Sequence, residues 1–204
     1  MKSWLVWPAA VIAALLPLVA AAQSPLLAWR DPIYIAAGFF GILALSLMVF
    51  QPLLAAGWLP GLTTRAARQI HRGIGAAIIL CVLLHVVGLW VTSPPDVVDA
   101  LLLRSPTPFA LWGVIALWAL IATAGLVILR DRAVLPWRRW RQAHSALAVV
   151  IIAATVLHAV LIQGTMEPYS KAALSVLLAA MAVLAFWRLG IWGRRRPGNR
   201  RPRA

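Results

Sequence analysis

The sequence predicts an all-α integral membrane protein, a bundle of six transmembrane helices. Of its 204 residues, 63% are hydrophobic and only 12% are charged, whereas soluble domains average about half apolar and a quarter charged. Six apolar segments come close to or exceed the roughly 20 residues that a helix needs to cross a bilayer. They lie at 4–22, 33–51, 71–92, 109–129, 142–163 and 172–192.

Runs that contain proline separate these segments. Proline cannot donate a hydrogen bond within a continuing helix, and proline beside serine or glycine is typical of loops. We expect the second segment to end at Gln51-Pro52 and the third at Ser93-Pro94-Pro95, and the fourth to open at Ser105-Pro106-Thr107-Pro108. The connection 93–108 is then the longest on its side of the membrane.

The first apolar segment has two interpretations. Lys2, the apolar run and Ala20-Ala21-Ala22 before Gln23 resemble a signal peptide with a small-residue cleavage site. The run is longer than a usual signal core, which favours a retained helix. We divide the chain into an N-terminal transmembrane helix or signal-like segment at 1–32, a membrane domain at 33–192 and a basic cytoplasmic tail at 193–204.

The net charge of +14 indicates membrane topology rather than a nucleic-acid partner. Lysine and arginine accumulate on the cytoplasmic side of membrane proteins. With the N-terminus inside, all 19 basic residues except Arg30, Arg104 and Lys171 fall on the inner side. We expect a multi-pass protein of a bacterial inner membrane, surrounded by lipid, with both termini cytoplasmic.

All four histidines fall into two pairs with one spacing. His71 and His85 lie 14 residues apart on the third segment, and His144 and His158 lie 14 apart on the fifth. Fourteen residues turn a helix through about 1400°, roughly 40° short of four turns, over roughly 21 Å. Each pair therefore lies on one helix face. Because both segments run outward, His71 and His144 share an inner depth, and His85 and His158 an outer one.

Facing imidazoles at two depths favour two b haems, each with an axial histidine on either side. A bare zinc or iron ion needs three or four convergent ligands, whereas the chain has one cysteine and five acidic residues. Haem brings four nitrogens and requires only axial ligands. A histidine can be purely structural, but an ionisable residue in the membrane is costly and indicates function by default.

Arginines crowd the inner ends of the two histidine segments, at Arg68, Arg72, Arg138, Arg139 and Arg141. Guanidinium groups pair with carboxylates, such as those of haem propionates or of an acidic partner. Arg72 and Arg141 are our candidates for cofactor contact. All five also fit ordinary positive-inside anchors, and the two interpretations do not exclude each other. Trp137 and Trp140 are candidates for the interfacial aromatic belt.

Two histidine-containing runs resemble a known family. Ile70-His71-Arg72-Gly73-Ile74-Gly75 through Leu84-His85 resembles the His-Arg-x-x-Gly…Leu-His helix of ferric reductase-like transmembrane domains, which also occur in NADPH oxidases. Gln142-Ala143-His144 through Leu157-His158 is similar to their second ligand helix. The resemblance covers about 33–192. It implies a six-helix fold with His71 and His144 on an inner haem and His85 and His158 on an outer one.

The resemblance does not extend to the electron donor. Ferric reductases and NADPH oxidases continue into a flavin and nicotinamide module, but this sequence contains no G-x-G-x-x-G or P-loop run. We therefore expect a separate flavoprotein or a membrane quinol as donor. Stand-alone domains of this size resemble the haem subunit of the periplasmic methionine sulfoxide reductase system. In that family the position of His71 is often not histidine.

These observations favour an oxidoreductase component that passes electrons to an outer-side acceptor, either a metal ion or a periplasmic reductase. One alternative is a quinone-linked b561-type cytochrome subunit of a larger complex. A second is a transporter or assembly factor without haem. Transporters are usually built from inverted repeats and broken helices, whereas the third and fifth segments form a parallel pair. No catalytic residue is assigned.

Overall fold

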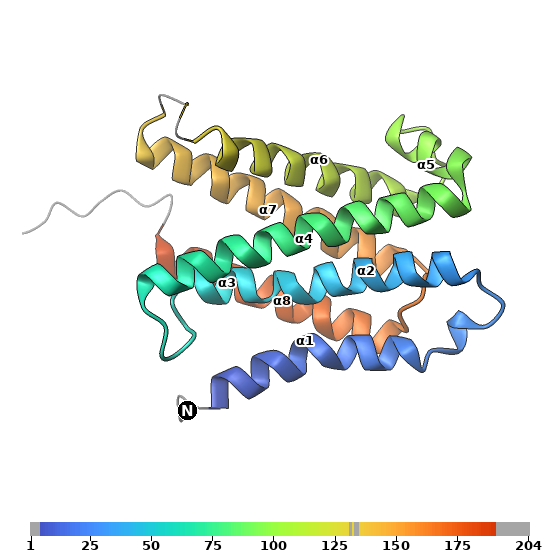
Figure 1. The fold of residues 1–204 in the computed structure, drawn as a ribbon, viewed down its shortest axis with the longest axis horizontal. Coiled ribbons are helices and arrows are strands. Elements are labelled where there is room, and N and C mark those ends of the chain that lie inside the picture. Colours follow the sequence, from blue (N-terminus) through green and yellow to red (C-terminus); the bar gives the residue numbers. More distant parts are fainter. Residues whose placement is uncertain (1–4, 131, 133–134, 191–204) are drawn as a thin grey trace, which may run out of the picture.

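The computed structural model describes residues 5–130, 132 and 135–190. These residues form α1 (Val6–Ala22), the 3-10 helix η2 (Pro25–Leu27), α2 (Pro32–Met48), α3 (Phe50–Ala55), α4 (Thr64–Thr92), α5 (Pro94–Leu101), α6 (Pro108–Ile128), α7 (Trp137–Leu161) and α8 (Pro168–Leu189). The described residues include no strand. Figure 1 shows the long helices side by side along the longest dimension of the molecule. The predicted tail at 193–204, residue 4 and residues 191–192 lie outside the described residues.

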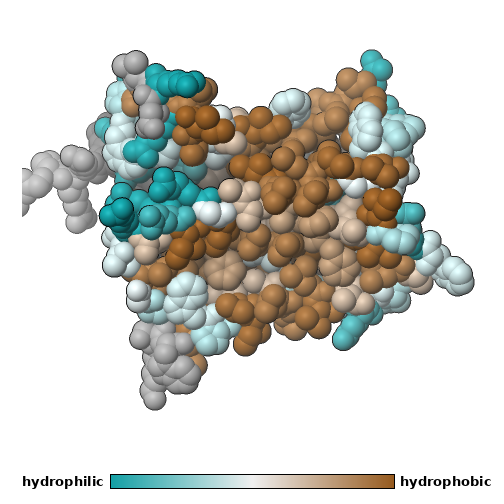
Figure 2. All heavy atoms as spheres, viewed as in Figure 1, coloured by the Kyte–Doolittle hydropathy of each residue, from teal (hydrophilic) through white to brown (hydrophobic). Residues whose placement is uncertain are grey.

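Five helical stretches are long and apolar enough to cross a membrane: Pro32–Ala55, Thr64–Thr92, Pro108–Ile128, Trp137–Leu161 and Pro168–Leu189. On the face shown in Figure 2, a hydrophobic band lies between two more hydrophilic ends. The chain is thus a multi-pass helical membrane protein. α1 is apolar, but its 17 residues fall short of the roughly 20 that a crossing needs. The sixth span therefore stays a prediction.

Two helices begin before their apolar segments do. α4 begins at Thr64 because the Thr63 hydroxyl accepts a hydrogen bond from Ala66 N at 3.2 Å and caps the first turn. α7 begins at Trp137, directly after a proline. His71 and His144 consequently lie about two turns inside continuous helices, where their backbones are fixed.

The sequence predicts that the second segment ends at Gln51-Pro52; α2 ends close to this point, at Met48, but Pro52 does not end the helical stretch. α3 carries the helix past Pro52, so that α2 and α3 together form one stretch, Pro32–Ala55. Proline fits because it is the third residue of α3, where the backbone N–H has no partner within the helix. The connection 93–108 is also more ordered than a plain loop, since it contains α5.

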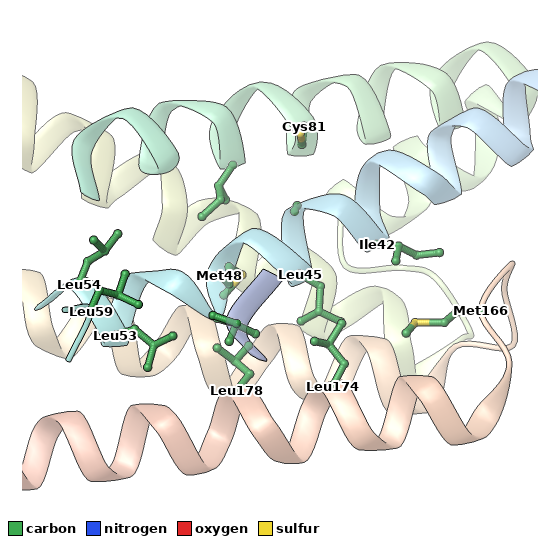
Figure 3. Packing of buried hydrophobic residues seen from close by; sticks show 14 of the residues in the cluster. Ile42, Leu45, Met48, Leu53, Leu54, Leu59, Cys81, Met166, Leu174 and Leu178 are labelled. Carbon is green, nitrogen blue, oxygen red and sulfur yellow. The ribbon is translucent and has the colours of Figure 1, made fainter. Parts of the chain in front are cut away.

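The helices pack as two close pairs with α1 and α8 alongside. α2 packs mainly against α4, and α6 mainly against α7, while α8 contacts α7, α1 and α3. Much of the buried hydrophobic cluster lies between α2 and α8, where Leu45 and Met48 approach Leu174 and Leu178 (Figure 3). α4 and α7, which carry the histidines, are not among the closely packed pairs of described helices. Side chains rather than backbones therefore meet between them.

Candidate functional site

The structure brings the four histidines together in the two pairs that the spacing predicts. The ring centroids of His71 and His144 lie 6.2 Å apart, with the ring planes at 61°. Those of His85 and His158 lie 6.4 Å apart, with the planes at 82°. In each pair one ring comes from α4 and the other from α7. We call them the 71/144 pair and the 85/158 pair.

The ring separation in both pairs fits a metal atom between two imidazoles. A metal–nitrogen bond is about 2.0–2.1 Å long and a ring centroid lies roughly 1 Å behind its nitrogen, so two opposed ligands hold their centroids roughly 6 Å apart. Among the described residues, no three His, Cys, Asp or Glu side chains gather to hold a bare ion. A metal at either pair would need further ligands from a cofactor, as haem iron has.

The 85/158 pair is held by backbone carbonyl groups. His85 Nδ1 lies 2.8 Å from Ala37 O on α2, and His158 Nδ1 lies 2.8 Å from Phe109 O on α6. A carbonyl oxygen only accepts, so each Nδ1–H must donate. In a neutral imidazole this leaves Nε2 without a proton, as a metal ligand requires. The backbone thus sets both the tautomer and the orientation of these rings.

A glycine lies against each of these two rings. A Cβ atom at Gly41 would lie 3.1 Å from His85 Nδ1, and one at Gly113 would lie 2.8 Å from His158 Nδ1. Each glycine follows the accepting carbonyl residue by four positions, and so lies one helical turn along on the same face. Glycine within a helix costs roughly 1 kcal/mol relative to alanine. Here each imidazole occupies the space that a larger side chain at the glycine position would fill.

The 85/158 pair also lines a cavity of about 780 Å³. Its walls come mainly from α2, α4, α6 and α7, with contributions from α5 and α8, and are mostly apolar, with Ile42, Met48 and Val82 among them. Pockets that hold cofactors typically measure about 300–1,000 Å³ and combine an apolar lining with a few polar groups. The cavity therefore has the size and the chemistry to take a large hydrophobic cofactor such as haem.

The 71/144 pair is less closely anchored by backbone, although the backbone of Gln51 lies beside the His71 side chain. His71 Nδ1 and His144 Nδ1 are buried and have no hydrogen-bond partner among the described residues. Instead, the Trp140 ring stacks on the His144 ring, with centroids 5.2 Å apart and planes at 6°. Trp140 Nε1–H donates to Leu126 O on α6 at 3.2 Å. A side chain, itself tied to α6, therefore orients His144.

Trp140 belongs to a longer stack at the start of α7. The Trp137 ring stacks on the Trp140 ring, with ring centroids 5.2 Å apart and planes at 13°. The Arg130 guanidinium lies 4.9 Å from the centroid of each tryptophan ring, a cation–π contact that contributes about 0.5–1 kcal/mol at exposed sites. Trp140, expected only as part of an interfacial belt, is thus a direct neighbour of a site histidine.

The two candidate arginines differ in burial. Arg141 is half-buried, and its Nε is buried with no hydrogen-bond partner among the described residues. It precedes His144 by three positions and so lies on a neighbouring part of the same helix surface. Arg72 is exposed, as are Arg68, Arg138 and Arg139. Arg141 therefore suits a buried anionic group, whereas Arg72 equally suits a surface anchor.

The spacing of the histidines does not indicate every neighbour of the site. Gly41, Gly113 and the stacking role of Trp140 are missed. A signal for the glycines exists, because each interrupts an apolar helix at a position where alanine would be favoured. Trp140 carries a weaker signal, because it precedes His144 by four positions and such residues are neighbours on a helix.

A comparison with protein families gives a match over the middle of the chain. Residues 40–155 match the family described as ferric reductase like transmembrane component. This range covers more than half of the chain and contains His71, His85 and His144, while His158 follows just beyond it. No curated protein and no solved structure matches the chain.

Proposed function

Because the chain belongs to the family of ferric reductase-like transmembrane components, we propose that this membrane redox component is a di-haem b cytochrome. In this proposal it passes electrons across a bacterial inner membrane to an outer-side acceptor, which is a metal ion or a periplasmic reductase. The observation that carries the proposal is the meeting of α4 and α7 at two levels, with imidazole centroids 6.2 and 6.4 Å apart.

Each histidine pair would hold one haem. His71 and His144 would hold the iron of the inner haem, and His85 and His158 that of the outer haem. Bound haem supplies an iron that accepts and releases one electron at a time. The residues of the chain hold the imidazoles in place and surround them with apolar walls. Around the 85/158 pair, the carbonyl groups of α2 and α6 leave both Nε2 atoms available.

The inner pair has basic side chains for an anionic cofactor. Arg141 is the stronger candidate for a haem carboxylate, because its Nε is buried without a partner among the described residues. Arg72, next to His71 in sequence, is the second candidate. Both also remain compatible with a role as positive-inside anchors.

The two pairs lie at different depths in the bundle. Their 14-residue separation corresponds to roughly 21 Å along a helix, a large part of the about 30 Å hydrocarbon core. The excess of basic residues at the 71/144 end supports a cytoplasmic location for that end. A flavoprotein or a membrane quinol would deliver electrons there, and the acceptor would meet the 85/158 end.

Haem stoichiometry tests the proposal. The detergent-purified protein should show oxidised and dithionite-reduced spectra of b haem, and a pyridine haemochrome assay should give two haems per chain. His158→Ala should leave one haem. Cys81→Ala, a buried change on α4 between His71 and His85, should leave two.

Each other outcome has a clear meaning. Wild-type protein without a Soret band would overturn the proposal and favour histidines that serve transport or assembly. Two haems retained in His158→Ala would overturn the ligand assignment. Reduction by a quinol analogue, but not by a flavoprotein reductase, would place the protein with quinone-linked cytochromes.

A further inference from the structure

One cation lines the cavity of the 85/158 pair. Lys171 is buried, with 9% of its surface exposed, and it lies in the cavity wall together with His85 and His158. It is the single lysine or arginine among the described residues that line this cavity, whereas Asp96 and Asp99 line it as well. Buried lysines are rare unless a partner compensates their charge.

The local structure of α8 does not by itself favour a positive charge at this position. Lys171 lies in the first turn of α8, which begins at Pro168, and the positive end of the helix dipole disfavours a cation there. Within the described residues, its Nζ donates one hydrogen bond, to Ile162 O at 2.7 Å. An ammonium group has three donors, so two remain for groups in the cavity.

The nearest acidic residue along the chain is occupied elsewhere. Glu167 caps α8 and accepts hydrogen bonds from Tyr169 N at 2.7 Å and from Ser170 N at 2.5 Å. Its carboxylate lies at the surface end of the helix, where water screens its charge. Glu167 therefore offsets only part of the charge of Lys171, four residues later.

We propose that Lys171 binds a carboxylate of the outer haem and raises its reduction potential. This inference rests on the proposed function, because it presupposes a haem held by His85 and His158. Lys171 would thus bind a carboxylate of the outer haem as Arg141 is proposed to bind one of the inner haem. A nearby positive charge favours the reduced form, which carries one more electron, and does so strongly where little water screens the charge.

Redox titration of three variants tests this positioning role. In Lys171→Gln the oxidised-to-reduced ratio of the outer haem at a fixed potential should rise about tenfold, a shift of about −59 mV for one electron. Lys171→Arg, which keeps the charge, should stay near wild type. Arg104→Gln, which removes an exposed charge at the same end of the bundle, should leave the potential unchanged. The outer haem is identified as the component that His158→Ala removes.

The measurement separates a charge effect from a structural one. A purely structural Lys171 would change stability or yield without changing the potential. Two haems with wild-type potentials in Lys171→Gln would therefore overturn the inference and leave the proposed function intact, whereas wild-type protein without haem would overturn both. If Lys171→Gln does not fold, Lys171→Met decides, because it replaces the charge by an apolar side chain of similar length. Loss of the positive charge should lower the outer potential as in Lys171→Gln, and an unchanged potential would overturn the inference.

Discussion

The two histidine pairs share their helices and nearly the same ring separation, but different groups hold the rings. In the 85/158 pair, carbonyl groups of α2 and α6 fix both Nδ1 atoms at 2.8 Å. In the 71/144 pair, neither Nδ1 has a partner among the described residues, and the Trp140 ring orients His144. The backbone thus anchors both rings of the 85/158 pair, whereas in the 71/144 pair a side chain orients His144.

The difference reflects how the helices pack around each pair. α2 lies close against α4, and α6 close against α7, and in each helix pair a carbonyl and a glycine four residues later receive one imidazole. This arrangement occurs twice, at Ala37 and Gly41 for His85 and at Phe109 and Gly113 for His158. Substitution cannot remove a backbone carbonyl. The 85/158 pair is therefore sensitive mainly to added volume, and the 71/144 pair to lost contacts.

The largest expected effect is that of Gly113→Ala. The new Cβ would lie 2.8 Å from His158 Nδ1, closer than such contacts occur, so the ring or its surroundings must shift, and we expect the ring to lose its place beside Phe109 O. We expect the protein to lose most of one haem, namely the one that His158→Ala removes, and to keep the other. Pyridine haemochrome stoichiometry and reduced-minus-oxidised spectra measure this change.

Gly125→Ala is the matched control on the same helix. A Cβ at Gly125 meets nothing within 4 Å, so this variant should keep two haems. Retention of two haems in Gly113→Ala as well would show that the close fit of glycine and imidazole does not position the ligand.

A middle-sized effect is expected for Trp140→Leu, which removes the stack from His144. Stacked aromatic pairs contribute about 0.5–1.5 kcal/mol beyond their buried area, so the inner haem should be lost up to about tenfold faster. Transfer of haem to an apo-globin acceptor, followed as two kinetic phases, measures this rate. The phase assigned to the outer haem should not change.

Trp137→Leu tests whether the effect belongs to the ring that touches His144. Trp137 stacks on Trp140 and is exposed, so its loss should change the inner phase much less. Equal effects of the two substitutions would mean that the tryptophans act through the membrane interface rather than through the histidine.

Much of the site geometry could be predicted because it lies along single helices. The 14-residue spacing places His71 and His85 on one face of α4, and it does the same for His144 and His158 on α7. The parallel course of the two helices then brings the rings together, as the structure shows. Length and hydropathy also predict five of the spans.

The remaining features depend on contacts between helices, which periodicity does not encode. The axial register of α2 relative to α4 decides which carbonyl group of α2 meets His85. The sequence pattern does not indicate this register. Pro52 shows the same limit on a local scale. Its effect depends on whether it falls in the first turn of a helix or later, and the sequence does not mark the start of α3, since Val49 before it makes no side-chain cap hydrogen bond.

The smallest expected effect is that of Gly41→Ala, and it sharpens the comparison most. The added Cβ would lie 3.1 Å from His85 Nδ1, so a shift of a few tenths of an ångström relieves the contact. We expect both haems to remain, with loss of the outer haem only a few-fold faster. Gly73→Ala on α4, near His71, meets nothing within 4 Å and should leave the inner phase unchanged. If haem loss is greatest in Gly113→Ala, smaller in Gly41→Ala and unchanged in Gly73→Ala, then glycine makes room for an imidazole only at the 85/158 pair. An equally large effect of Gly73→Ala would remove this distinction between the pairs.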